Sequence, residues 1–337
     1  MNQRRLTVRD LSVAFSTPDG PLPVVHEVSF TLDAGETLAV VGESGSGKSV
    51  TSLAVMRLLP PPPRAQISGQ VLFHRQGSDT DLVGLSERRM RRVRGDRIAM
   101  IFQEPLTSLN PVHRVGHQIV ESIRCHRPVS QADARTRAID LLDRVGITEP
   151  EARLEAYPHE LSGGMRQRVM IAIALALEPD ILIADEPTTA LDVTVQAQIL
   201  ELLRDIQQQS GMAILFITHN FGVVAEIADR AMVMYSGRVV EEGRAAEVLT
   251  RPLMPYTSGL MRSVPRIEWA GRSRQDLGTI EGFVPDPARM PTGCAFHPRC
   301  RHHSPGLCDA RLPDLEEAAP DHRLRCLRWR SLEGQRG

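Results

Sequence analysis

The stretch Gly42-Glu43-Ser44-Gly45-Ser46-Gly47-Lys48-Ser49 decides how the rest of this sequence is interpreted. It fits the pattern G-x-x-x-x-G-K-[ST], in which backbone N–H groups of a glycine-rich loop surround the phosphates of a nucleotide. Lys48 is the single lysine among 40 lysine and arginine residues. An ammonium group is a compact point charge, whereas a guanidinium is a planar fork, so this position favours a small cation that reaches between phosphate oxygens. The stretch predicts a nucleoside triphosphate site, with Lys48 on the β- and γ-phosphates and the Ser49 hydroxyl on Mg²⁺.

The flanking residues predict the strand, loop and helix that such a site requires. Residues 37–41 are apolar without alternation, as in a strand buried on both faces. Residues 50–59 suit a helix, which the prolines at 60–63 end. Earlier, residues 6–15 and 24–32 alternate with period two around turn residues, which predicts an antiparallel pair of strands.

The remaining pattern predicts an α/β fold with a mainly parallel core sheet. Further strands are expected at 98–102, 181–184, 213–218 and 231–235. Helices that alternate with apolar strands are typical of such a sheet, covered on both faces. To this core we add an antiparallel β subdomain from the first strands and a helical subdomain over about 115–178. The alternating pattern ends near Gly243, so we expect a nucleotide-binding domain over 1–245 and a small extension over 246–337.

Polar residues follow three of these predicted strands directly. Asp185 and Glu186 follow 181–184, Gln103 follows 98–102, and His219 follows 213–218. Ligands bind at the carboxyl ends of strands in open α/β sheets. Asp185 is then placed for Mg²⁺, and Glu186 for polarising the water that attacks the γ-phosphorus. Gln103 and His219 alone would more commonly be structural, but their convergence with the carboxylates favours one site.

The stretch Leu161-Ser162-Gly163-Gly164-Met165 precedes a predicted helix at 166–177. Ser162 fits the helix N-cap, and glycines at a helix start can also form an anion site. Capping alone would explain the serine, so both interpretations remain open at this point.

Taken in order, these motifs resemble the ATPase subunit of an ATP-binding-cassette (ABC) transporter over about residues 6–245. The resemblance rests on 42–49, Gln103, 161–165, 181–186, Ala190-Leu191-Asp192 and His219. Met165 departs from the family signature, which usually has glutamine there. That methionine and the stretch Ile101 to Pro111 are similar to the ATPase subunits of dipeptide, oligopeptide and nickel importers, in particular to the subunit lettered D.

The resemblance implies roles for individual residues. Gln103 would contact Mg²⁺ or the attacking water and report to the membrane subunits, and His219 would hold the γ-phosphate and Glu186 together. Phe15 would stack on adenine, although an ordinary strand aromatic explains it equally well. The segment around Ser162, with Asp192, would close over ATP held by the opposite subunit.

The resemblance also implies partners and a location. It implies a second ABC ATPase subunit, favoured to be a paralogue, two transmembrane permease subunits and an extracytoplasmic solute-binding protein. The chain itself has no apolar stretch near the roughly 18–20 residues that span a bilayer. We therefore expect a peripheral protein at the cytoplasmic face of the cell (inner) membrane.

Four cysteines lie near the end of the chain, at Cys294, Cys300, Cys308 and Cys326. Structural zinc prefers close C-x₂₋₄-C pairs, which these intervals lack, whereas iron–sulfur clusters use more varied spacings. The importer resemblance extends here and implies a [4Fe–4S] cluster, with zinc and free thiols as the alternatives.

Composition bears on the competing functions. The net charge of −1 gives no reason to expect nucleic acid as a partner, and the basic run at 88–94 is interpreted as a solvated helix face. One alternative is an ABC-type ATPase that acts on DNA or the ribosome, but the chain has one cassette and no coiled-coil insertion. A binding module with an inactive site is opposed by Glu186 and His219. The favoured interpretation is the ATP-hydrolysing subunit of an importer for short peptides or a related solute such as nickel.

Overall fold

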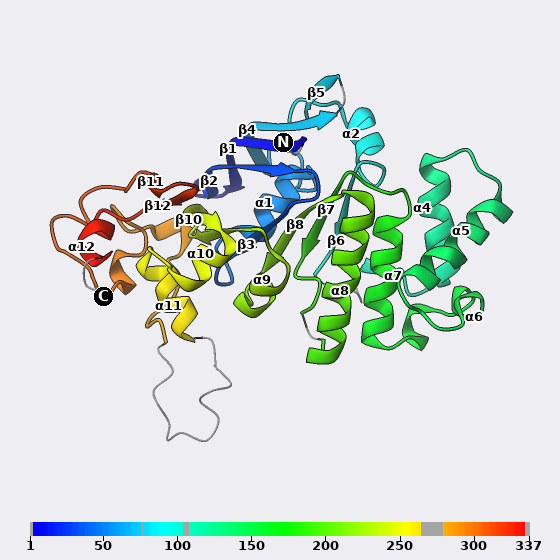
Figure 1. The fold of residues 1–337 in the computed structure, drawn as a ribbon. Helices are drawn as coiled ribbons and strands as arrows, with labels where there is room; N and C mark the ends of the chain where they lie inside the picture. The colour runs from blue at the N-terminus through cyan, green and yellow to red at the C-terminus, as the bar shows by residue number, and fades with distance from the viewer. Residues whose placement is uncertain (1–2, 76, 104–107, 190, 264–278, 334–337) are drawn as a thin grey trace, which may run out of the picture. The chain divides into compact units, whose positions relative to one another are not determined.

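The computed structural model describes residues 3–75, 77–103, 108–189, 191–263 and 279–333 (Figure 1). The chain divides into two compact units. The first comprises Met1–Thr7, Thr31–Thr37 and Leu72–Ile217, and the second Val8–Phe30, Leu38–Val71 and Thr218–Gly337. Among the described residues, no helix combines the length and the apolar character that crossing a membrane would need.

Parallel strands form the centre of the first unit. β6 (Ile98–Ile101), β7 (Ile181–Asp185) and β8 (Ala213–Thr218) pair in parallel, with Ile98 opposite Ile181 and Ile181 opposite Ala213. All five residues of β7 are buried. Two longer helices, α7 (Gly163–Leu175) and α8 (Val193–Ser210), run along these strands in Figure 1. The predicted α/β class is therefore confirmed.

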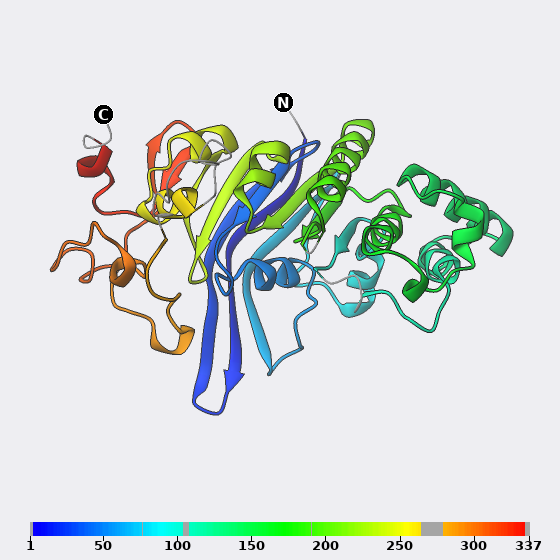
Figure 2. The same ribbon diagram turned by 90° about the horizontal axis from the view of Figure 1, so that it is seen from below.

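A group of helices completes the first unit. α4 (Val115–His126), α5 (Gln131–Arg144) and α6 (Pro150–Leu154) pack on one another, and α5 also packs on α7 (Figure 2). Ala138, Leu141 and Leu142 lie on the buried face of α5, as their helical spacing predicts. A single 3₁₀ turn, Pro158–Glu160, leads toward α7.

The second unit combines a parallel strand pair with an antiparallel extension. β3 (Thr37–Val41) pairs in parallel with β9 (Arg230–Tyr235), and β9 pairs antiparallel with β10 (Arg238–Arg244). β12 (His322–Leu324) returns from the end of the chain to pair with β10, and β11 (Glu316–Ala319) pairs with β12. The last two strands were not predicted, because they are short and rich in charge.

A further sheet contains four strands, in the order β2 (Gly20–Asp33), β1 (Arg4–Thr17), β4 (Ala65–Arg75) and β5 (Ser78–Asp81). β1 (Arg4–Thr17) and β2 (Gly20–Asp33) form the long hairpin seen in Figure 2, as expected from their alternation. β4 (Ala65–Arg75) and β5 (Ser78–Asp81) were not predicted. The basic run lies on α2 (Glu87–Val93), of which Met90 is the buried residue, in keeping with a solvated face.

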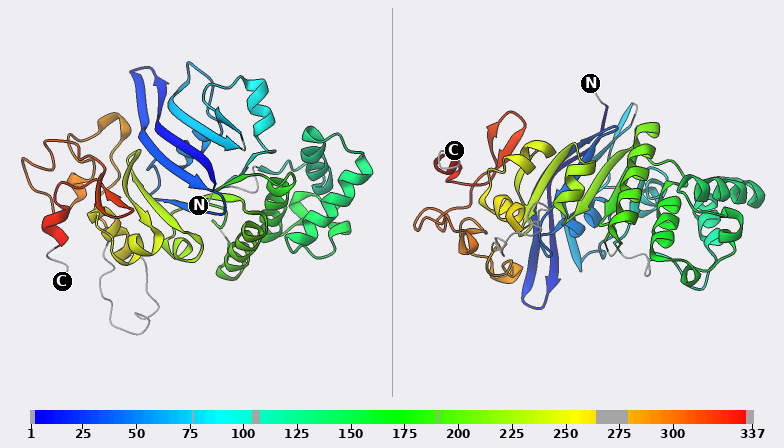
Figure 3. Two further views of the ribbon diagram at one scale, coloured as in Figure 1. Left: turned by 45° about the horizontal axis from the view of Figure 1, so that its top comes forward. Right: turned by 60° about the horizontal axis from the view of Figure 1, so that its bottom comes forward.

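Short helices cover the strands of the second unit. α9 (Phe221–Ile227) and α10 (Ala245–Thr250) contact each other and lie beside β9 and β10 in Figure 3. α11 (Pro255–Ser263), two 3₁₀ turns (Pro287–Arg289 and His297–Arg299) and α12 (Trp329–Glu333) follow. Three aromatic rings join α11 and the start of the 3₁₀ turn His297–Arg299 to β9. Tyr235, Tyr256 and Phe296 pack at centroid distances of 4.6 to 5.3 Å. The extension therefore shares a core with the strands.

Candidate functional site

The glycine-rich loop connects β3 to α1 (Lys48–Val55) in the second unit. Gly42 has a φ of 155°, and a Cβ atom there would lie 2.3 Å from the carbonyl oxygen of Met234. Only glycine fits this close approach between two backbones. Gly47 takes the left-handed conformation as the N-cap of α1. The loop therefore turns sharply into the helix N-terminus, the arrangement that suits a phosphate group.

The Lys48 side chain lies back over the loop from which it comes. Its ammonium group donates hydrogen bonds to the carbonyl oxygens of Gly42, at 2.8 Å, and Glu43, at 3.0 Å. The residue is 6% exposed. A small cation is thus held against the backbone carbonyls of the loop, and its role toward phosphate stays a prediction.

Glu43 connects the loop to the C-terminal extension, which was not predicted. Arg299 donates to both carboxylate oxygens of Glu43, at 2.7 and 2.9 Å. The backbone N–H of Glu43 donates to the Tyr256 hydroxyl at 2.9 Å. The hydrogen bonds with Glu43 raise the pKa of Arg299 above its ordinary value, and burial raises the pKa of the Tyr256 phenol. Arg299 therefore stays charged, and Tyr256 stays neutral, at any physiological pH.

The carboxyl end of β7 brings Gln103 and Glu186 together in the first unit. One carboxylate oxygen of Glu186 accepts hydrogen bonds from the Gln103 side-chain amide, at 3.0 Å, and from the Thr189 hydroxyl, at 2.8 Å. The Glu186 backbone has a φ of 48°, which is uncommon for a residue with a side chain and is concentrated at functional sites. Its N–H is held by the carbonyl of Ile217 at 2.9 Å. Asp185, one residue earlier, is 5% exposed at the end of the buried strand.

Thr189 is a site residue that sequence reasoning missed. A hydroxyl three residues after a carboxylate can turn back to it, because the chain reverses after a strand end. The pair Thr188-Thr189, separated from the two acidic residues by Pro187, was the signal available for this contact.

Ser162 and Asp192 both cap helices. The Ser162 hydroxyl accepts from the N–H of Met165 at 3.3 Å at the start of α7, and the Asp192 carboxylate accepts from the N–H of Val195 at 2.9 Å at the start of α8. Ser162, Gly163 and Asp192 are exposed, and Leu161 is buried. Gly164 lies close to Val195, since a Cβ there would be 3.0 Å from that side chain. The capping interpretation is thus confirmed, and a role toward a second subunit stays a prediction.

The remaining predicted residues are placed more simply. His219 is exposed directly after β8, and Phe15 is half-buried on β1. Their roles beside nucleotide stay predictions. Ala190 and residues 104–107 of the importer-like stretch lie outside the described residues.

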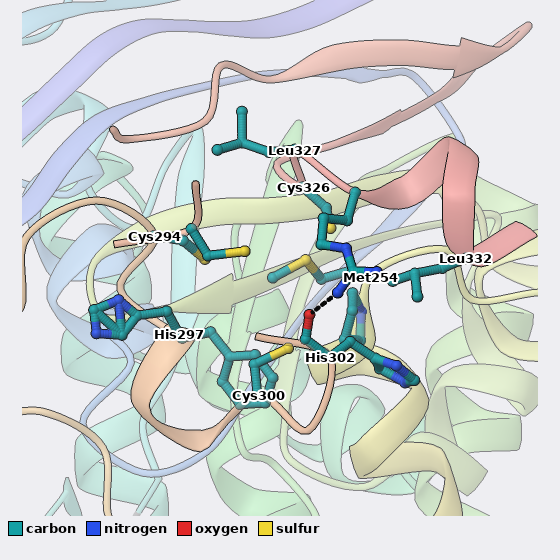
Figure 4. Close-up of a pocket in the computed structure, with 12 residues that line it drawn as sticks. Met254, Cys294, His297, Cys300, His302, Cys326, Leu327 and Leu332 are labelled. Atoms are coloured by element: carbon teal, nitrogen blue, oxygen red, sulfur yellow. Dashed lines mark hydrogen bonds between the residues drawn. The ribbon is translucent and has the colours of Figure 1, made fainter. Parts of the chain in front are cut away.

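The four C-terminal cysteines line one cavity, together with Met254, Phe296 and Leu327 (Figure 4). In Figure 4 the sulfur atoms of Cys294, Cys300 and Cys326 turn toward this shared space. Burial raises the pKa of Cys294 and of Cys326 to about 11, and it also raises that of Cys300, so these thiols are neutral near pH 7. Within the described part of the chain, no group of three or more His, Cys, Asp and Glu side chains is arranged to hold a metal ion. The structure thus gathers the four thiols but gives the [4Fe–4S] expectation no further support.

Comparison with known proteins identifies the family. Residues 25–189 match the family model described as ABC transporter, and residues 240–308 match the C-terminal region of the oligopeptide/dipeptide transporters. A putative peptide import ATP-binding protein of Brucella melitensis is 50% identical over 97% of this chain and 98% of its own length. The chain belongs to the ABC transporter family. The oligopeptide transport ATP-binding protein OppD of Bacillus subtilis is 53% identical over 87% of this cassette and 80% of its own length.

Solved structures agree with this assignment. A dimeric ATP-binding cassette in a post-hydrolysis state, bound to ADP and Pi, has a TM-score of 0.62 and 26% identity, and the match covers 71% of this chain and 98% of that one. A cassette of Clostridium perfringens that is part of an ABC transporter complex has a TM-score of 0.61 at 28% identity, covering 74% and 92%. The chain is therefore an ABC-type ATPase, and the alternative of an ATPase acting on DNA or the ribosome receives no support.

Proposed function

We propose that this cassette is the ATP-hydrolysing subunit of a membrane importer for short peptides or a related solute such as nickel. The observation that carries the proposal is 50% identity over almost the whole chain to a protein named for peptide import. The match of residues 240–308 to the oligopeptide/dipeptide transporters supports the same cargo class.

Each residue group has a defined part in the proposed ATP hydrolysis. The loop amides of residues 42–49 and the Lys48 ammonium hold the β- and γ-phosphates, and Phe15 stacks on adenine. Ser49, Gln103 and Asp185 would hold Mg²⁺ through their side-chain oxygens, and the ion would neutralise phosphate charge. Glu186 orients the attacking water, and Gln103 and Thr189 fix its carboxylate by the hydrogen bonds described above. His219 contacts the γ-phosphate.

The coupling to transport requires partners. We propose that the signature Leu161, Ser162, Gly163, Gly164 and Met165, with Asp192, faces ATP held by a second cassette, a paralogue. ATP binding clamps the two cassettes together, and hydrolysis releases them. Two transmembrane permease subunits convert this cycle into import of solute from an extracytoplasmic binding protein, which places the cassette at the cytoplasmic face of the inner membrane.

A reconstituted complex tests this function. The chain, a partner cassette and candidate permease subunits are assembled in proteoliposomes with the binding protein. Short peptide should stimulate ATP turnover and accumulate inside. Glu186→Gln should lower turnover about a hundredfold or more while ATP binding persists. If the protein binds ATP but its turnover is the same with and without peptide and no peptide is taken up, the transport role is refuted.

We further propose that Cys294, Cys300, Cys308 and Cys326 hold a [4Fe–4S] cluster, with zinc as the alternative. Support comes from the four thiols on one cavity and from the preference of such clusters for thiolate ligands. Iron and acid-labile sulfide are measured in anaerobically purified protein, with Cys125→Ser as the control that should retain them. Stoichiometric zinc without iron would overturn the cluster assignment.

A further inference from the structure

Glu43 lies at the centre of a set of contacts that joins the C-terminal extension to the phosphate loop. The sequence motif leaves this position open to any residue. In the structure its carboxylate is bound by both terminal nitrogens of Arg299, at 2.7 and 2.9 Å. Such a two-bond guanidinium–carboxylate pair fixes orientation as well as distance, which a single ammonium contact does not.

Arg299 is itself held rigidly within the extension. Its Nε donates to the carbonyl of Glu281 at 3.0 Å, and one terminal nitrogen also lies 3.4 Å from the Tyr235 hydroxyl. The side chain is 5% exposed and directly precedes Cys300, at the end of the 3₁₀ turn His297–Arg299. The guanidinium is therefore positioned before it meets Glu43, so little side-chain freedom is lost in making the pair.

The same glutamate also positions the loop atoms beside the phosphate site. The carbonyl oxygen of Glu43 accepts from the Lys48 ammonium at 3.0 Å and from the N–H of Ser46 at 3.2 Å. Glu43 thus connects Arg299 on one side with Lys48 on the other. A shift of its backbone would move both a loop amide and the acceptor of the ammonium group.

We propose that Arg299 is a positioning residue for nucleotide binding, which fixes the phosphate loop through Glu43 and makes the affinity for ATP depend on the cysteine-bearing extension. The inference rests on the proposed function only in taking ATP as the ligand. Arg299 acts without touching nucleotide, so its effect should fall on the phosphates that Lys48 contacts.

Equilibrium binding to the full chain tests this inference, with ATP and AMP as the probes. Arg299→Gln should raise the Kd for ATP about tenfold, because a charge-assisted pair is replaced by at most one neutral hydrogen bond. The Kd for AMP, which lacks the β- and γ-phosphates, should change less than twofold. Arg299→Lys should recover part of the affinity. Arg301→Gln, an exposed arginine two residues further on, is the matched control and should leave both constants unchanged.

A double-mutant cycle distinguishes a specific pair from a general loosening. Glu43→Gln keeps the shape of the loop residue and should itself weaken ATP binding, and the double variant with Arg299→Gln should be no weaker than the worse single variant. Thermal unfolding of each variant shows whether it is folded. Additive effects, equal effects on AMP and ATP, or an unchanged ATP Kd in folded Arg299→Gln would each overturn the inference. Wild-type protein that fails to bind ATP would instead refute the proposed function.

Discussion

The carboxyl ends of β7 and β3 both carry predicted site residues, but they are built in different ways. At the end of β7, Glu186 is held by Thr189, three residues along the chain, and by Gln103, which follows another strand. At the end of β3, Glu43 is held by Tyr256 and Arg299, more than 200 residues later. The first arrangement is mostly local, and the second depends on how the end of the chain folds back. A sequence motif therefore predicts the residues that face the ligand. It does not predict the distant residues that hold the motif in place.

The largest expected effect concerns Lys48 at the β3 end. Lys48→Ala should raise the Kd for ATP, and lower turnover in the complex, about a hundredfold, because a preorganised cation is removed from the phosphates. Lys48→Arg keeps the charge but introduces a planar fork, and it should not restore turnover. Isothermal titration measures the Kd for ATP of each variant, and phosphate release measures its turnover. Normal activity in Lys48→Arg would show that the absence of lysine elsewhere in the chain had no bearing on this position.

The next effect concerns the attachment of the extension on which the β3 end depends. Glu241 is fully buried, and its carboxylate accepts from the N–H groups of Leu253, at 2.6 Å, and Met254, at 3.2 Å, while His322 Nε2 lies 2.8 Å away. Glu241→Ala removes the acceptor that these three groups share in the core and should lower the free energy of unfolding by about 3 kcal/mol. Glu247→Ala, at an exposed position on α10, should change it by less than about 0.5 kcal/mol. Chemical denaturation measures the free energy of unfolding of both variants. Equal losses in Glu241→Ala and Glu247→Ala would contradict the role of Glu241 in attaching the extension.

Sequence reasoning succeeded where the signal is periodic or closely spaced. The bounds of β3 and β8 were predicted because four or more consecutive apolar residues must be buried on both faces. Glu186 and Gln103 were expected together because the carboxyl ends of parallel strands meet at one edge. β12 was missed, since its three residues have no period to detect and it is held by pairing with β10, some 80 residues earlier. Arg299 was missed for the same reason, because nothing in the spacing of an arginine-rich tail singles out its partner at Glu43.

At the β7 end we expect a smaller effect, which should lower kcat and leave the KM for ATP nearly unchanged. Thr189→Val removes the hydroxyl that donates to Glu186, while the volume is kept. The carboxylate then loses a charge-assisted hydrogen bond, so kcat should fall about tenfold with the KM for ATP within about twofold. Thr189→Ser retains the hydroxyl and should restore most of kcat. An equal rise in KM would mean that the hydroxyl serves nucleotide binding, which would make the two strand ends less distinct than their contacts indicate.

The smallest effect concerns the second contact at the β3 end. Tyr256→Phe keeps a ring that packs on Tyr235 and Phe296 but removes the acceptor of the Glu43 N–H. One neutral hydrogen bond contributes about 1 kcal/mol, so the Kd for ATP should rise by no more than about fivefold, less than in Arg299→Gln.

Tyr235→Phe serves as the comparison variant. Its hydroxyl lies 3.4 Å from Arg299, a longer contact than the two hydrogen bonds from Arg299 to Glu43, so its loss should raise the Kd for ATP less than Tyr256→Phe does. Since burial raises the pKa of Tyr256 above its ordinary value, the hydroxyl stays protonated and the affinity should not change between pH 7 and pH 9. Fluorescence titration with a labelled ATP measures the Kd of Tyr256→Phe, the Kd of Tyr235→Phe and the dependence of the affinity on pH. If Tyr256→Phe weakens ATP binding more than Arg299→Gln does, the backbone contact and not the ion pair fixes the loop. The dependence of the β3 end on the extension would then reside in α11 and not in the cysteine-bearing segment.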